Sequence, residues 1–279
     1  MSPATAEWRA RAFVGRRSVV PACAAGADGD LPPVVLRADD GSLLPLDPAR
    51  WHGSPTRTEQ RLLSSLSGPV LDVGCGPGRL VIGLACRGVP ALGVDSAAGA
   101  VSLARSRGAS VLQRSVFEPL PGEGRWRSVL LLDGNLGIGG DAVHLLRRCR
   151  GLAAPDGAIV AEVERPGTGW RTCRARLERG TDHGPWFGWS VVGADAIDRV
   201  AVSAGLTLDR VERTSDGRGQ RWFAHLLAVE ARHTSTTQAP AGHASRAGPG
   251  GSGHASPALP GRSATEHAPP DHEGECVSH

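Results

Sequence analysis

The chain has 279 residues, a formal net charge of +3 and a hydrophobic fraction of 40%. This length is enough for one α/β domain with a complete core plus flanking segments. All 31 basic residues are arginine, because the sequence has no lysine, and it also has no tyrosine and one asparagine. A small net charge without a dense basic run argues against a polyanionic partner, and no apolar run approaches the ~20 residues that a membrane span needs.

The six cysteines are scattered, without a C-x-x-C pair or a spacing typical of zinc sites. They predict a reduced, cytoplasmic protein. Residues 15–24 (GRRSVVPACA) are similar to a twin-arginine export signal, but the apolar stretch is short and contains Pro21. Export is therefore the disfavoured alternative.

The first 68 residues divide into two parts. Residues 1–30 are rich in Ala, Gly and Arg without periodicity, and we expect them to be loosely ordered. Residues 31–68 predict a hairpin and a helix. Asp40-Gly41 lies between two apolar runs, as in a β-hairpin. The helix is predicted over 54–67, with Ser54 as its cap and Pro55 at its first position.

From Val70 onward, short apolar strands alternate with amphipathic helices. We predict strands over 70–73, 91–95, 109–113, 128–133 and 158–164, and helices over 78–87, 96–107 and 141–152. This alternation indicates a parallel sheet covered by helices on both faces.

The rhythm changes after the fifth predicted strand. Residues 171–178 alternate with period two and are predicted to pair with 186–192 across a turn at 180–184. A helix over 194–204 and an antiparallel pair over 206–213 and 221–230 follow. The segment 231–279 lacks apolar periodicity, so we expect a disordered tail. Six of the ten histidines lie in this tail with irregular spacing, which disfavours a specific metal site.

The most informative stretch is VLDVGCGPGRL, residues 70–80, with glycines at 74, 76 and 78 directly after a predicted strand. Such a strand–turn–helix unit presents helix N-terminal amides to a ligand. The dinucleotide fingerprint G-x-G-x-x-G requires a third glycine where this chain has Arg79. A P-loop is excluded because no G-K-[ST] follows. Asp72 would repel a pyrophosphate, but it suits a ligand that carries an ammonium or sulfonium group.

These residues carry a resemblance to a known family. VLDVGCGPGR resembles motif I of the class I S-adenosylmethionine (SAM)-dependent methyltransferases, and GVDS places Asp95 where that family holds the ribose hydroxyls. Asp95 alone does not separate SAM from NAD. The segments 115–121, 131–141 and 186–189 resemble an actinobacterial-type subgroup of these enzymes.

The resemblance covers about residues 51–230 and implies a fold and an activity. The fold would be α/β, a doubly wound, mostly parallel, Rossmann-like sheet of seven strands with a terminal antiparallel strand. Residues 69–230 would form the SAM-binding methyltransferase domain, with 171–192 as an insertion on the substrate side. The activity would be SAM-dependent methyl transfer to a small or medium-sized acceptor, giving S-adenosylhomocysteine (SAH).

The resemblance also implies cofactor-binding residues, mostly at the ends of the predicted strands. Ser115 stands where the family usually has an aspartate for the adenine amino group, and Val116 would read adenine through its backbone N–H. For Asn135, a loop around the methyl-donor end and a left-handed turn residue remain open alternatives. The full cofactor set is Asp72, Gly74, Cys75, Gly76, Gly78, Asp95, Ser96, Ser115, Val116, Asp133 and Asn135.

The acceptor side is less defined by the sequence. Trp51, Trp186, Phe187 and Trp189 are candidates for the apolar wall of a substrate pocket, with an ordinary minor core as the alternative. Asp133 and His183 are the catalytic candidates, with Glu162 and Glu164 as alternative carboxylates. A base is required only when the acceptor must lose a proton.

Two other functions remain open. An NAD(P)-dependent oxidoreductase is disfavoured by Asp72 and Arg79. A non-catalytic SAM-binding module would share the cofactor residues and lack turnover. Nucleic acid is disfavoured as an acceptor because the motif [DN]-P-P-[YFW] is absent. The sequence predicts no oligomeric state.

Overall fold

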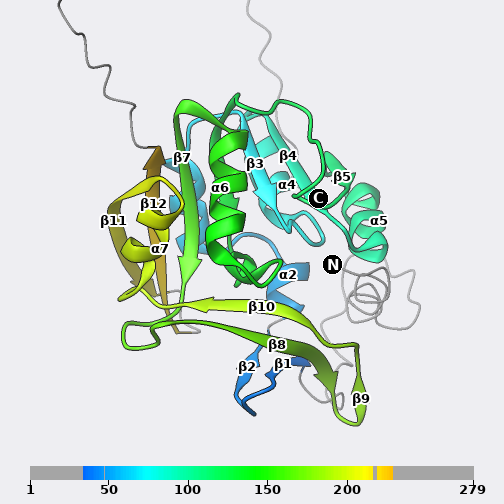
Figure 1. Cartoon of the computed structure of the whole chain (residues 1–279). Helices are drawn as coiled ribbons and strands as arrows, with labels where there is room; N and C mark the ends of the chain where they lie inside the picture. Colours follow the sequence, from blue (N-terminus) through cyan, green and yellow to red (C-terminus); the bar gives the residue numbers. More distant parts are fainter. Residues whose placement is uncertain (1–33, 47, 216–218, 229–279) are drawn as a thin grey trace, which may run out of the picture. The chain divides into compact units, whose positions relative to one another are not determined.

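The computed structural model describes residues 34–46, 48–215 and 219–228 (Figure 1). The segments over 1–30 and 231–279, for which we expect little order, lie outside the described residues, as do the six tail histidines. None of the helices within the described ranges is both long and apolar enough to cross a membrane.

The central sheet has seven strands in the order β11-β12-β7-β6-β3-β4-β5. They are β3 (Val70–Val73), β4 (Ala91–Asp95), β5 (Val111–Gln113), β6 (Trp126–Leu131), β7 (Ala153–Val163), β11 (Leu206–Ser215) and β12 (Gln220–Ala228). The strands from β3 to β7 pair in parallel, whereas β12 is antiparallel to both β7 and β11. The predicted doubly wound sheet with an antiparallel last strand is confirmed.

Helices cover both faces of this sheet. The helices are α2 (Pro48–His52), α3 (Arg57–Ser64), α4 (Arg79–Ala85), α5 (Ala98–Ser106), α6 (Ala142–Leu152) and α7 (Ile197–Ser203), with a 3₁₀ turn η1 (Asn135–Gly137). The apolar residues of α6 and α7 share one cluster, and those of α3 and α4 share another.

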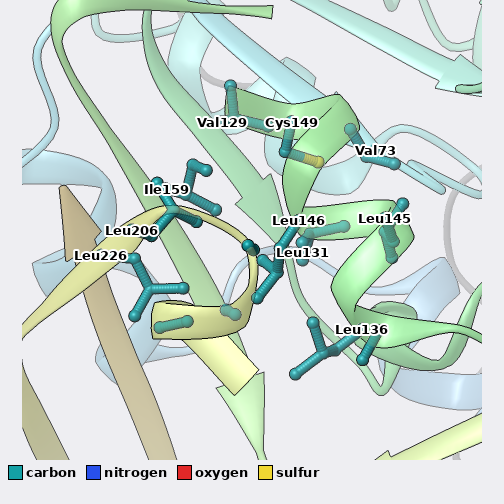
Figure 2. Packing of buried hydrophobic residues seen from close by; sticks show 14 of the residues in the cluster. Val73, Val129, Leu131, Leu136, Leu145, Leu146, Cys149, Ile159, Leu206 and Leu226 are labelled. Atoms are coloured by element: carbon teal, nitrogen blue, oxygen red, sulfur yellow. The ribbon is translucent and has the colours of Figure 1, made fainter. Parts of the chain in front are cut away.

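Strand β6 shows how the sequence builds both layers. Val129 and Leu131 pack with Leu145 and Leu146 of α6, as Figure 2 shows. Leu130, one residue along, points to the opposite face and joins the α3–α4 cluster. Each fully buried leucine contributes roughly 1.5–3 kcal/mol. A continuous apolar strand is therefore required here, because both of its faces are covered.

The start of α3 differs from the prediction. The helix begins at Arg57, and its cap is Thr56 rather than Ser54. The Glu59 N–H donates to Thr56 Oγ1 at 3.3 Å, and the Thr56 N–H donates to Glu59 Oε2 at 2.9 Å. This reciprocal capping box satisfies two N-terminal amide groups, which explains why it defines the helix start.

A second, antiparallel sheet lies across the carboxyl ends of the central strands. Its order is β10-β8-β1-β2, and β9 pairs with β8. Its strands are β1 (Val34–Ala38), β2 (Leu43–Pro45), β8 (Trp170–Arg179), β9 (Asp182–His183) and β10 (Phe187–Val192). In Figure 1 the arrowheads of β3 and β7 point toward β8 and β10.

The pairings of this second sheet were predicted in part. The β1–β2 hairpin and the β8–β10 pair confirm the predictions for 34–46 and 171–192. Their union through β1 and β8, with Leu36 opposite Leu177, was not predicted. The sheet is joined to the central layer by two isolated bridges, Ile138 to Trp189 and Glu164 to Gly193.

Candidate functional site

The glycine turn after β3 is tied to the tip of β4. The Gly74 N–H donates to the Val94 carbonyl at 2.8 Å. The buried Asp95 carboxylate accepts the Gly76 N–H at 3.0 Å and the Ala97 N–H at 2.8 Å. Asp95 therefore fixes the turn with one lone pair of each oxygen and retains further acceptor capacity.

Two of the three glycines are required for different reasons. Gly74 has φ +73°, and a Cβ there would lie 2.7 Å from Asn135 Nδ2. Gly78 has φ +80°, caps α4, and would place a Cβ 2.7 Å from that of Ala109. Gly74 thus permits close approach of the loop after β6, whereas Gly78 permits close packing against Ala104 of α5 and against Ala109.

A first cavity opens between the glycine turn and the second sheet. Its empty volume is about 810 Å³, counting the part open to solvent. Asp72, Cys75 and Gly76 line it from the turn, and Trp51 and Trp189 line it from α2 and β10. Asp95, Asp133 and Asn135 also line it. The cavity therefore collects most of the predicted cofactor residues at the carboxyl edge of the sheet.

The Asp72 carboxylate in this cavity is poised for a cation. Its residue is 2% exposed, and its Oδ2 has no hydrogen-bond partner among the described residues. Burial raises the pKa of Asp72 to about 7, although Arg79 opposes the shift. Asp133 and Asp95 raise the pKa further. A buried carboxylate without a partner is costly, and a bound ammonium or sulfonium group would relieve that cost.

A buried ion cluster forms the floor beside Asp72. Arg79 pairs with Glu59 of α3 at 2.5 Å and with Asp133, which follows β6. Arg221 of β12 pairs with Glu59 at 2.7 Å and lies 3.3 Å from Asp133. Although burial opposes the shift, Arg79 and Arg221 hold the pKa of Glu59 below its ordinary value.

Glu162 completes this cluster at the end of β7. Its two carboxylate oxygens each lie 2.7 Å from a different nitrogen of Arg221, a bidentate pair. The Asp133 N–H also donates to Glu162, at 2.7 Å. The Asp133 backbone has φ +55°, outside the range that most side chains adopt. The Asp133 carboxylate is thus already paired with Arg79 and Arg221, so it helps to hold the residues of the site in place.

A second cavity continues from the first, past Asp133. Trp51, Asp133 and Trp189 line both cavities. Arg50, Glu162, Glu164, Arg221 and Trp222 also line the second cavity. Arg50 lies 3.9 Å from the Asp133 carboxylate. Sequence reasoning missed Arg50, Glu59, Arg221 and Trp222, and only Glu59 carried a visible signal, the capping box.

A third cavity lies on the other side of Asp95. It is lined by Asp95, Ser96, Ser115, Val116 and Phe117, among others. The Ser115 hydroxyl accepts the Phe117 N–H at 3.3 Å and so shapes the turn after β5. The Phe117 ring stacks on His144, with centroids 5.0 Å apart. The third cavity therefore brings Ser96, Ser115 and Val116 together, whereas Asp72 lines the first cavity.

The aromatic candidates divide between two environments. Trp189 is 7% exposed and packs edge-on against Phe187 at 5.9 Å. Trp186 lies under the guanidinium of Arg176, 4.8 Å from its ring centroid. Of the residues predicted for the substrate wall, Trp51 and Trp189 line the described cavities, whereas Trp186 and Phe187 do not.

Two further predicted residues have defined places. His183 is exposed on β9, opposite Glu178 of β8, and lines none of the three cavities described above. Asn135 donates to the carbonyls of Val73 at 2.9 Å and Gly74 at 3.0 Å. The alternative of a left-handed Asn135 is wrong, because the positive φ values fall on the two residues before it.

Comparison with protein-family models and with curated proteins finds no match. Solved structures do match. A SAM-dependent methyltransferase from Bacteroides fragilis, in complex with SAH, has a TM-score of 0.57 and 19% identity over 72% of this chain and 90% of that chain. The glycopeptide N-methyltransferase MtfA has a TM-score of 0.51 and 13% identity over 64% and 92%. The likeness establishes the Rossmann-like fold that these methyltransferases share.

Proposed function

We propose that this protein binds SAM and transfers its methyl group to a small or medium-sized acceptor, giving SAH. The observation that carries the proposal is Asp72, a buried carboxylate with an unpartnered oxygen beside a glycine turn. The fold shared with the Bacteroides fragilis methyltransferase, which was solved with SAH, supports the same cofactor class. The segments 131–141 and 186–189 support an actinobacterial-type subgroup.

The charge of the site separates this proposal from an NAD(P)-dependent oxidoreductase. Within the described residues, five carboxylates and three guanidinium groups line the first and second cavities. The excess is negative, although the whole chain has a net charge of +3. A diphosphate would meet repulsion here, whereas a cationic ligand would be favoured.

The proposed cofactor residues follow from the cavity linings. Asp72 would accept a hydrogen bond from the ammonium group, and Asp95 would accept hydrogen bonds from the ribose hydroxyls. The third cavity would take the adenine, with Phe117 beside its face and Val116 at its edge. Asn135 acts on the cofactor side by holding the carbonyls of the glycine turn in place.

The reaction requires little covalent chemistry from the protein. SAM supplies a methyl group on a positively charged sulfur, which an acceptor atom attacks in line. The residues of the first cavity hold one reactant, and the second sheet covers the carboxyl edge and excludes water. We propose residues 69–230 as the cofactor domain, with 171–192 and β1 forming the acceptor side.

Calorimetry on the purified full chain tests this function. SAM and SAH are expected to bind and NAD is not. Asp95→Ala is expected to lose that binding, because it removes both the turn anchor and the acceptor for the hydroxyls. Turnover is followed as SAH production over a panel of acceptors. Binding of NAD with no binding of SAM or SAH would overturn the proposal.

A further inference from the structure

We propose that the second cavity is the acceptor site and that it selects an amine, with Glu164 as the carboxylate that recognises it. The inference rests on the proposed function, because it takes the first cavity as the site of the methyl donor. It assigns a chemical class to the acceptor.

The position of the second cavity makes it the neighbour of the methyl donor. Trp51 and Trp189 line both cavities, so a ligand in the second cavity lies against the same two rings. Trp222 adds a third indole to the second cavity. Three of the seven tryptophans of the chain therefore surround one space. Indole faces attract organic cations, and ammonium groups in particular.

Each charged side chain that lines the second cavity, except Glu164, has a partner of opposite charge within ion-pair distance. The Arg221 guanidinium is bound by both oxygens of Glu162. The Asp133 carboxylate has Arg79 and Arg221 as partners, and Arg50 lies 3.9 Å away. Glu164 follows Glu162 by two residues, and the charges that act on its carboxylate are those of Glu162, Arg165 and Arg171. In the described part of the chain, Glu164 is the cavity carboxylate without an arginine at ion-pair distance.

Glu164 is also held in a fixed place at the opening of the cavity. Its N–H donates to the Val192 carbonyl at 2.9 Å, and its carbonyl accepts the Ala194 N–H at 2.9 Å. These two bonds join the end of β7 to the end of β10, where the two sheets meet. The residue itself is exposed, so its carboxylate can meet an incoming ligand.

The chemistry of an amine acceptor agrees with this arrangement. The lone pair of a neutral amine forms the new N–C bond while the C–S bond breaks, and the electron pair of that bond passes to sulfur. The positive charge thereby moves from sulfur to nitrogen, and the nitrogen then releases a proton to water at the cavity opening. Glu164 and the indole faces stabilise the charge on nitrogen. A phenolate or carboxylate acceptor would instead place negative charge beside Glu162 and Glu164.

Calorimetry with three probes of similar shape tests the inference. 2-Phenylethylamine, 2-phenylethanol and 3-phenylpropanoate are titrated separately into the full chain saturated with SAH at pH 7.5. The protonated amine carries the charge that the methylated product carries. It is expected to bind at least about tenfold more tightly than the alcohol, with the anion weakest.

Two variants show whether the preference belongs to Glu164. Glu164→Gln is expected to reduce the preference for the amine about tenfold while leaving SAH affinity unchanged. Glu212→Gln is the matched control, because Glu212 is exposed on β11 and lines neither the first nor the second cavity. It should keep the preference.

The outcomes separate this inference from the proposed function. If SAH itself does not bind, the methyltransferase assignment fails. If SAH binds but the amine shows no preference, including no binding of any probe, the amine class is wrong. The same holds if Glu164→Gln keeps the preference of the wild type.

Discussion

The Arg79 guanidinium lies 2.5 Å from the Glu59 carboxylate, and both side chains are almost completely buried. Arg79 is the first residue of α4, and Glu59 lies in α3. The pair joins the helix that follows the glycine turn to the segment that precedes the central sheet. Arg79, which stands where the dinucleotide fingerprint requires a glycine, therefore links α4 to α3 through a buried ion pair.

Replacing Arg79 should destabilise the fold strongly. In Arg79→Met the carboxylates of Glu59 and Asp133 lose a buried partner, so we expect a loss of about 3–5 kcal/mol. Urea unfolding followed by circular dichroism measures it. Arg105→Met, at an exposed position of α5, is the control and should change stability by less than about 0.5 kcal/mol. Equal effects of the two variants would contradict the assignment of Arg79 as a buried counter-ion.

Asp72→Asn should stabilise the ligand-free protein at high pH. The pKa of Asp72 is raised from 3.8 to about 7 in the folded state, so the native protein loses stability as the pH rises between these values. At pH 8 the ionised Asp72 carboxylate lowers the free energy of unfolding by at most about 4 kcal/mol, and Asp72→Asn lacks this cost. Urea unfolding at pH 8 and pH 4 tests this, because the gain should vanish at pH 4. A gain of the same size at both pH values would exclude a titrating carboxylate.

The same residue should make cofactor binding depend on pH in the opposite sense. SAH carries an ammonium group, which is favoured by the ionised form of Asp72. Affinity for SAH should therefore rise about tenfold between pH 6 and pH 8 and level off above the pKa of about 7. The profile of Asp72→Asn should be flatter and its affinity at pH 8 lower. Parallel profiles for the two proteins would show that Asp72 does not meet the ammonium group.

Most of the central sheet could be predicted because its signals are local. Each parallel strand contains a short apolar run, and the turn at Gly74 lies directly after one of them. The carboxyl ends of parallel strands meet at one edge, so Asp72 and Asp95 could be placed together from the sequence. The β1–β8 pairing could not, because Leu36 and Leu177 are far apart in the chain and each strand already had a local partner.

The buried ion cluster around Arg79 and Arg221 could not be predicted from the sequence, for a different reason. The Arg221–Glu59 hydrogen bond joins residues that are 162 positions apart, and both residue types are usually exposed. An arginine that pairs inside the core has the same local sequence context as one on the surface. The capping box from Thr56 to Glu59 marks the observed helix start, which the sequence pattern placed at Ser54, and nothing in it indicates that the Glu59 carboxylate is buried.

Gly74 and Asn135 should show a measurable energetic coupling. Gly74→Ala introduces a Cβ 2.7 Å from Asn135 Nδ2 and also strains a backbone with φ +73°. Asn135→Ala removes that obstacle together with two hydrogen bonds to backbone carbonyls. Gly74→Ala should therefore cost less in the Asn135→Ala background, with a coupling of about 0.5–3 kcal/mol. Urea unfolding of the four proteins gives the coupling, and additivity would mean that the two residues do not meet.

Two Gly→Ala substitutions should change stability in opposite directions. A Cβ at Gly137 of η1 would lie 2.3 Å from Cε2 of Trp189 and 2.7 Å from the Ser190 carbonyl oxygen. Backbone cannot move aside as a side chain can, so Gly137→Ala should cost about 1–3 kcal/mol. A Cβ at Gly151 of α6 meets nothing within 4 Å, and alanine there should gain about 0.5 kcal/mol. Urea unfolding compares both variants with the wild type. Because Trp189 lines both cavities, a neutral Gly137→Ala would mean that β10 is not packed on η1, and the wall shared by the two cavities would then lose its support.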